Sequence, residues 1–216
     1  MNKKYKIGVV IVAIFIALCL LFFVNKPPTI GMSNIKEIAL IDYSSDINFR
    51  QTVNDCGPYN VATVVRALKK EKIDSSKFAK EIKWRLPNKY TLPLGLERQL
   101  KENGINIEIP QVKRLSDRDK IAFLHEQLSL GNPIVILGGI DHYQHYMTIF
   151  GFNSNKDEFY IYDSLQEENP DNLSLTIDEN DELPGNKSMS SKDLMDFWRK
   201  GGMYGIYKWY AIVASL

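Results

Sequence analysis

The chain has 216 residues, of which 44% are hydrophobic and 25% are charged, close to the averages for globular domains. Its 27 basic and 26 acidic side chains give a formal net charge of +1, without the basic excess of nucleic-acid-binding domains. Two cysteines exclude a disulfide-dense scaffold and a four-thiolate zinc site. We therefore expect one globular domain with an appendage, and no nucleic-acid partner.

An apolar segment near the N-terminus is predicted to anchor the chain in a membrane. Ile7–Val24 holds 18 residues without a charge, and as a helix it would be about 27 Å long, enough to cross the hydrocarbon core. Lys3, Lys4 and Lys6 precede it, and such basic flanks stay in the cytoplasm. We expect a single-pass protein of the cell membrane with a cytoplasmic N-terminus.

Residues 1–24 would then form the anchor, residues 25–35 a linker, and residues 36–216 one domain outside the cytoplasm. The alternatives are a cleaved secretory signal and a buried helix of a soluble domain. A cleaved signal needs small residues at its cleavage site, and the apolar run ends Leu-Leu-Phe-Phe-Val-Asn without one. The anchor is therefore the favoured interpretation.

Hydrophobic periodicity predicts mainly helices in the first half of the domain and mainly strands in the second. Strands are expected at 36–43 and 105–109, and helices at 57–72, 75–84, 93–103 and 116–130. Later strands are expected at 133–137, 145–152, 158–163 and 207–213, with a polar, acidic surface loop at 167–187 and a helix from Ser190 to Trp198. This order predicts an α+β fold, with N-terminal helices packed on an antiparallel sheet.

Cys56 is the best candidate nucleophile. Cys19 lies within the apolar run, so Cys56 has no cysteine partner in the domain, which indicates a reactive thiol or an intermolecular bridge. It stands immediately before a predicted helix, whose N-terminal partial charge and free N–H groups favour a thiolate. Gln51 lies five residues upstream, and its amide can donate to an oxyanion together with the Cys56 N–H. The alternatives are a buried, inert cysteine and a polar loop glutamine.

A nucleophilic cysteine needs a base, and the chain has three histidines. His125 falls in an amphipathic helix and is expected to be a surface or boundary residue. His142 lies in a polar loop, whereas His145 begins a strand and is the favoured base. The next strand ends at Asp163. If the two strands are hairpin neighbours, the Asp163 carboxylate can fix the tautomer of the imidazole; otherwise it is an ordinary strand-end acid.

A zinc site is the competing interpretation. Asp141, His142, His145 and Cys56 could together bind the metal. However, a His-x-x-His spacing at the start of a strand places the two rings on opposite faces of the sheet. We therefore expect neither a metal nor a cofactor.

These residues resemble the C39-like cysteine peptidases of the papain-like superfamily. The resemblance is carried by Gln51, by Asp-Cys-Gly-Pro at 55–58 before a helix, by His145 and Tyr146, and by Asp163. It implies a papain-like fold in which Cys56 is the nucleophile, His145 the general base and acid, Asp163 the orienting residue and Gln51 the oxyanion donor. Ser164 follows Asp163, where proline is commoner in the group.

The expected function is that of a membrane-anchored cysteine peptidase that cleaves an amide bond of a peptide or protein substrate. The alternative is a catalytically silent, peptidase-like binding module for a peptide or a cell-surface ligand. The acidic stretch 167–181 favours the alternative, because it could cover the cleft or dock a partner.

Overall fold

The computed structural model describes residues 27–32, 35–43, 50–140, 143–165, 183–202 and 205–216, together with residues 12, 14 and 15. Within these residues, none of the helices has the length and apolar character needed to cross a bilayer. Nearly all of the expected anchor, Ile7–Val24, lies outside the described residues, as does most of the expected acidic loop.

The described strands form one antiparallel sheet in the order β2-β7-β3-β4-β5-β6, and β1 pairs with the end of β4. The strands are β1 (Ile38–Leu40), β2 (Asn106–Glu108), β3 (Ile134–Ile140), β4 (Tyr143–Asn153), β5 (Glu158–Tyr162), β6 (Lys187–Ser190) and β7 (Ala211–Ser215). The antiparallel sheet of the sequence analysis is therefore confirmed, and β4 lies near its centre.

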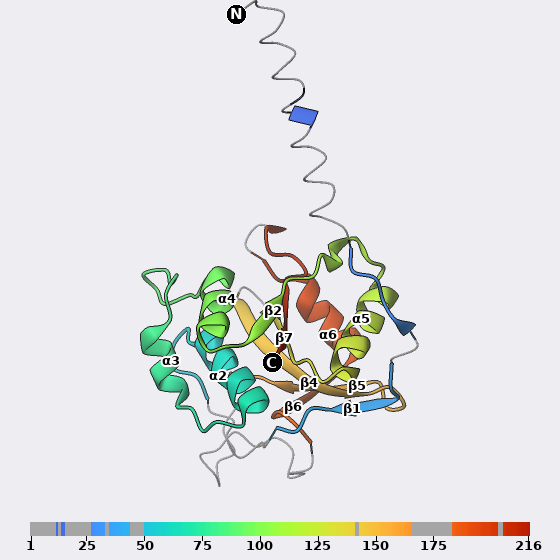
Figure 1. Cartoon of the computed structure of the whole chain (residues 1–216), viewed down its shortest axis with the longest axis horizontal. Coiled ribbons are helices and arrows are strands. Elements are labelled where there is room, and N and C mark those ends of the chain that lie inside the picture. The colour runs from blue at the N-terminus through green and yellow to red at the C-terminus, as the bar shows by residue number, and fades with distance from the viewer. Residues whose placement is uncertain are drawn as a thin grey trace, which may run out of the picture.

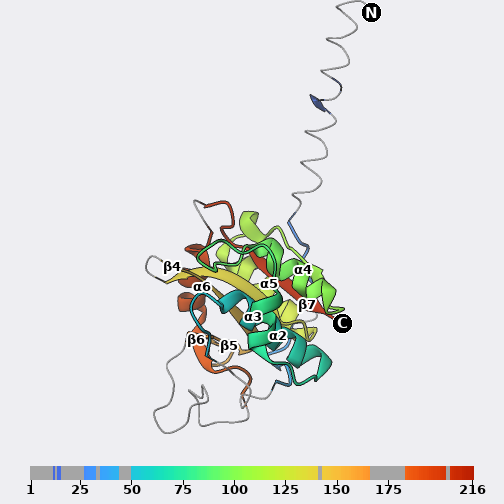
Figure 2. The same cartoon turned by 90° about the vertical axis from the view of Figure 1, so that its left-hand side faces the viewer.

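Helices cover both faces of the sheet. They are α2 (Cys56–Lys69), α3 (Ser75–Glu81), α4 (Pro93–Glu102), α5 (Asp117–Ser129) and α6 (Ser191–Arg199), with a short 3-10 helix at Val112–Arg114. Helices α2, α3 and α4 lie on one side of the sheet, and α5 and α6 lie on the other (Figure 1). When the molecule is turned, α2 and α3 stand in front of the sheet (Figure 2). The fold is α+β as expected, and its helices lie on both faces of the sheet (Figure 1).

The central strand β3 explains this arrangement, because successive side chains of a strand point to opposite faces. Val135 and Leu137 join the core under α2 and α4. Ile134 and Ile136 join the core that includes residues of α5 and α6. A strand buried on both faces reads as a continuous apolar run, which is what 133–137 shows.

Two segments differ from their expected structure. The last strand begins at Ala211, and residues 207–210 instead form a turn in which Tyr210 N–H donates to the Tyr207 carbonyl at 3.0 Å. Strand β6 was not predicted: Lys187 was expected to end the polar loop and Ser190 to open a helix, and the sequence Lys-Ser-Met-Ser carries little β-propensity. Pairing with β5 stabilises it as a strand, and β6 brings Lys187 to the site described below.

Candidate active site

Cys56 is the first residue of α2, and its side chain is buried, with 6% of the residue exposed. Asp55 occupies the N-cap position, but its side chain makes no capping hydrogen bond. The carboxylate instead pairs with the guanidinium of Arg85 at 2.6 Å. The positive end of the helix is thus left without a side-chain cap from Asp55, and it lies at the thiol, as the sequence predicts.

Arg85 holds the segment that leads into Cys56. Its Nη2 also donates to the carbonyl of Asn54 at 3.1 Å, and its Nη1 donates to the carbonyl of Ala79 at 2.9 Å. The guanidinium therefore joins the loop before α2 to the end of α3. Because Asp55 is buried and ionisable, loss of Arg85 would leave a carboxylate in a poorly solvated position.

His145 and Asp163 form a buried pair. The Nε2 of His145 lies 2.8 Å from Oδ1 of Asp163, and the two residues are 1% and 2% exposed. The pairing of β4 with β5 sets Thr148 opposite Tyr162. If this register continues by one residue, Asp163 lies opposite Met147 and diagonally across from His145. Side chains at such diagonal positions can contact each other across two strands. The predicted hairpin contact is therefore present.

Charge and hydrogen bonding set the protonation of this pair. Burial lowers the pKa of His145, but hydrogen bonds to Asp163 and to the Cys56 thiol outweigh it and raise the pKa to about 9. Burial raises the pKa of Asp163, but His145 and Lys187 together hold it well below its usual range. Both shifts favour the form of the pair with a protonated imidazole and an ionised carboxylate.

The imidazole contacts the acid and lies near the thiol. Its Nε2 faces Asp163 at 2.8 Å, and Cys56 is close enough to raise the pKa of the imidazole. The fold thus brings together three residues from α2, β4 and the end of β5. The contact between His145 and Asp163 is the one that the sequence predicts, and the catalytic roles of Cys56, His145 and Asp163 stay a prediction.

Further contacts fix the Asp163 carboxylate and its backbone. Lys187 Nζ lies 2.9 Å from Oδ2, and the N–H of Leu165 donates to Oδ1 at 2.9 Å. The side chain of Asn186 accepts from the Asp163 N–H at 2.8 Å and donates to its carbonyl at 3.0 Å. Both Asn186 and Lys187 come from the segment at the start of β6.

Asn60 joins the nucleophile to the strand that carries the base. Its Nδ2 donates to the carbonyl of Cys56 at 2.8 Å and to the carbonyl of Tyr146 at 2.9 Å. Its Oδ1 accepts from the Thr148 hydroxyl at 2.6 Å. Tyr146 is the neighbour of His145, so one buried carboxamide sets the spacing between the first turn of α2 and β4.

Gln51 lies beside the turn that follows Asp163. Its backbone N–H donates to the Ser164 carbonyl at 2.9 Å, and its Oε1 accepts from the Ser164 hydroxyl at 2.7 Å. A turn in which Asp55 N–H donates to the Thr52 carbonyl at 3.2 Å separates Gln51 from Cys56. The four residues named by the sequence thus belong to one region of the fold.

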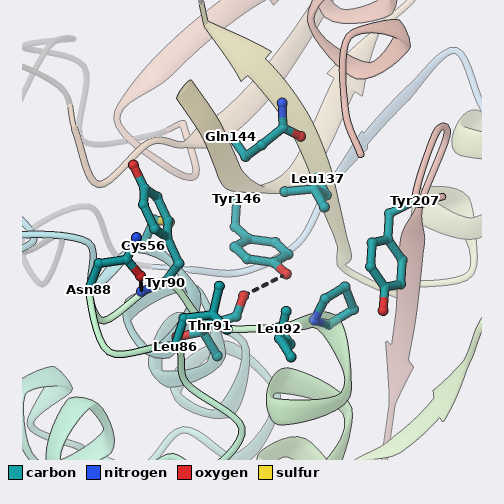
Figure 3. Close-up of a pocket in the computed structure, with 11 residues that line it drawn as sticks. Cys56, Leu86, Asn88, Tyr90, Thr91, Leu92, Leu137, Gln144, Tyr146 and Tyr207 are labelled. Atoms are coloured by element: carbon teal, nitrogen blue, oxygen red, sulfur yellow. Dashed lines mark hydrogen bonds between the residues drawn. The ribbon is translucent and has the colours of Figure 1, made fainter. Parts of the chain in front are cut away.

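A cavity of about 320 Å³ opens beside Cys56. Tyr90, Tyr146 and Tyr207 surround it, and the Tyr146 hydroxyl donates to the Thr91 carbonyl at 3.1 Å (Figure 3). None of the described residues that line the cavity carries a charge. The lining residues are Cys56, Leu86, Asn88, Tyr90, Thr91, Leu92, Pro93, Leu137, Gln144, Tyr146 and Tyr207.

An aromatic ring from α6 shields the base. Phe197 meets His145 edge-on, with ring centroids 6.4 Å apart. Gly138, the residue paired with His145 in β3, makes room for it, because a Cβ there would lie 2.2 Å from the Phe197 ring. The ring excludes water from the imidazole, which strengthens its hydrogen bonds.

The other two histidines of the chain are His125 and His142. His125 is a boundary residue as expected, since its ring stacks on Phe152 at 3.9 Å and burial lowers its pKa to about 4. His142 and its neighbour Asp141 lie outside the described residues.

The residues that support the candidate site were missed by the sequence analysis. Asn60 left a detectable signal, because it is a polar residue one helical turn after Cys56 and therefore shares its face of α2. Ser164 was noticed only as a departure from proline. Nothing in the local sequence of Lys187 or Arg85 distinguishes either residue from a solvated surface cation.

Comparisons with known proteins agree with this architecture. Residues 40–181 match the Peptidase_C39 like family, and the chain belongs to that family.

Among solved structures, the chain is similar to the peptidase domain of Streptococcus ComA, a bi-functional ABC transporter involved in a quorum sensing pathway. The identity is 18% and the TM-score 0.50, over 77% of this chain and 96% of that domain. The peptidase domain of Streptococcus mutans ComA, in complex with a small-molecule inhibitor, gives 19% identity and a TM-score of 0.42 over 78% and 98%. The first match shows a shared fold. No curated protein sequence matches the chain significantly.

Proposed function

We propose that the chain is a cysteine peptidase that cleaves an amide bond with Cys56, His145 and Asp163. The observation that carries the proposal is the buried contact of 2.8 Å between the His145 ring and the Asp163 carboxylate, with the Cys56 thiol close enough to raise the pKa of the imidazole. This contact favours a hydrolase over a silent binding module, for which no proton path between thiol and base is needed.

In the proposed reaction the Cys56 thiolate attacks the scissile carbonyl carbon, and the negative charge moves to the carbonyl oxygen. The backbone N–H of Cys56 and the amide of Gln51 stabilise that oxyanion. The imidazolium of His145 then protonates the leaving amine. In the second step neutral His145 takes a proton from water, which attacks the acyl group and releases Cys56. Asp163 holds the ring in the required tautomer throughout.

The substrate is proposed to be a peptide or protein with an uncharged residue near the scissile bond. The cavity beside Cys56 is lined by tyrosine, leucine and other uncharged side chains. A charged substrate side chain would lose its hydration there without gaining an ionic partner from these residues. Family membership supports a peptide substrate as well.

The chain is further proposed to be anchored in the cell membrane through Ile7–Val24, with the peptidase domain outside the cytoplasm. The support is the uncharged 18-residue run and the lysines before it. A membrane-impermeant maleimide applied to intact cells should label the wild-type protein and not Cys56→Ala. Labelling that requires permeabilised cells would contradict this topology.

Hydrolysis itself is tested with the full-length protein in detergent and a library of uncharged and charged fluorogenic peptides. Cys56→Ala should abolish cleavage, whereas Cys19→Ala, the matched control, should retain it. Wild-type protein that binds peptides from the library without cleaving any of them would favour the binding module.

A further inference from the structure

The turn that carries Asp163 makes a second connection to the site, through the next residue. Ser164 is fully buried, and its hydroxyl donates to Oε1 of Gln51 at 2.7 Å. A backbone hydrogen bond of 2.9 Å, from Gln51 N–H to the Ser164 carbonyl, holds the same two residues together. The two contacts fix the glutamine at its backbone and at the end of its side chain.

The side-chain contact has a chemical direction. A carboxamide has a donating end and an accepting end of almost the same shape, and its neighbours decide which way it points. Because the Ser164 hydroxyl is bonded to Oε1, the NH₂ group of Gln51 is turned away from Ser164. A developing oxyanion requires donors, and a carbonyl oxygen in their place would repel it.

The position of Ser164 is itself fixed by the hydrogen bonds of its neighbour Asp163. Asp163 accepts the Leu165 N–H at 2.9 Å, and its backbone is held on both sides by Asn186. These hydrogen bonds fix the turn, and therefore the position of the Ser164 hydroxyl, independently of its contact with Gln51. One turn after β5 orients His145 through a carboxylate and Gln51 through a hydroxyl.

We infer that Ser164 is a positioning residue of the peptidase, which orients the Gln51 carboxamide so that its NH₂ group faces the oxyanion. The inference rests on the proposed hydrolase activity and extends it to a residue outside the triad. It makes Ser164 important for the stabilisation of the transition state and unimportant for the reactivity of the thiol, which depends on His145 and α2.

The test compares Ser164→Ala, Gln51→Ala and the double variant, each as full-length protein. Gln51→Ala should lower kcat about 100-fold, as loss of an oxyanion donor does in other acyl-transfer enzymes. Ser164→Ala should lower kcat about tenfold with KM unchanged, because the amide then samples both orientations. Ser164→Thr, which keeps the hydroxyl, should recover much of that loss.

Two readouts separate positioning from a general structural effect. The double variant should be no slower than Gln51→Ala, because Ser164 acts through that residue. The rate at which iodoacetamide alkylates Cys56 should be the same in Ser164→Ala and wild type. Losses that multiply in the double variant, an unchanged kcat in Ser164→Ala, or a matching fall in alkylation would each overturn the inference. Failure of Cys56→Ala to affect hydrolysis would instead overturn the proposed function.

Discussion

The hydroxyl of Thr148 donates to Oδ1 of Asn60 at 2.6 Å, and both side chains are fully buried. Through Nδ2 the same carboxamide binds the carbonyls of Cys56 and Tyr146. With the Thr148 contact, both N–H hydrogens and the oxygen of the carboxamide have hydrogen-bond partners. The Asn60 carboxamide, fully hydrogen-bonded within an apolar core, therefore sets the distance between the helix that carries the thiol and the strand that carries the base.

Thr148→Val removes that hydroxyl with little change of shape. The Oδ1 of Asn60 would be left buried without its partner, which costs about 1–3 kcal/mol of unfolding free energy. We expect urea unfolding to show this loss, and the alkylation of Cys56 to slow. Thr63→Val is the matched control, because the Thr63 hydroxyl donates to the backbone carbonyl of Asn60 and not to its side chain. Equal alkylation rates in the two variants would contradict the role of the carboxamide.

Arg85→Gln should destabilise the protein by about 3 kcal/mol. The side chains of Arg85 and Asp55 are 15% and 5% exposed, and removing one partner of a buried pair leaves the other charge uncompensated. Arg98→Gln breaks an exposed pair with Glu102 and should change stability by less than about 1 kcal/mol. The difference is measured by chemical denaturation at pH 7, and equal effects would show that the loop before Cys56 does not depend on Arg85.

The histidine–aspartate pair predicts how stability depends on pH above neutrality. The folded pKa of His145 is raised to about 9, so its stabilisation is fully present below the unfolded value of about 6.5 and is lost as pH rises through 9. Asp163, whose folded pKa is lowered, keeps its contribution at every pH above its unfolded value of about 3.8. The stability difference between wild type and His145→Gln should therefore shrink between pH 6.5 and 9. A difference independent of pH over that range would contradict the ionised pair.

The lowered pKa of His125 predicts that folding stability decreases as the pH falls below neutrality. Burial against Phe152 lowers its pKa to about 4, while Asp157 opposes the shift. The unfolded chain therefore takes up a proton below about pH 6.5 and the folded chain does so near 4, so stability falls across that interval. His125→Phe should reduce this acid-dependent loss of unfolding free energy by about 2 kcal/mol. The value is discounted because the His125 side chain is partly exposed. Its hydrolytic activity at pH 7 should equal that of wild type.

The elements and the contact between His145 and Asp163 could be predicted from the sequence for local reasons. Ser190 was expected to open a helix, and its hydroxyl caps that helix by accepting from the N–H of Asp193 at 3.1 Å. Cys56 was recognised by its place before a helix, and Asp163 by its place at the end of a strand next to that of His145. Each of these inferences needs only a helix end or a hairpin, which short stretches of sequence specify.

The supporting contacts could not be predicted, because each joins segments far apart in the chain. Lys187 reaches Asp163 through the pairing of β5 with β6, and that strand has too little apolar character to be recognised. The Ser164 contact with Gln51 depends on how the loop before α2 lies across the sheet. The sequence analysis did not predict which face of the sheet each helix covers, and α6 lies on the side opposite α2 (Figure 1).

The central claim, that the Cys56 thiol is activated by His145, is tested most directly by alkylation with iodoacetamide at pH 6. Wild type should react at least about tenfold faster than a free peptide thiol, because the thiolate is stabilised by the imidazolium and the helix N-terminus. His145→Gln, of similar volume, should lose most of this acceleration. A wild-type rate no greater than that of the free thiol, in folded protein, would contradict the account.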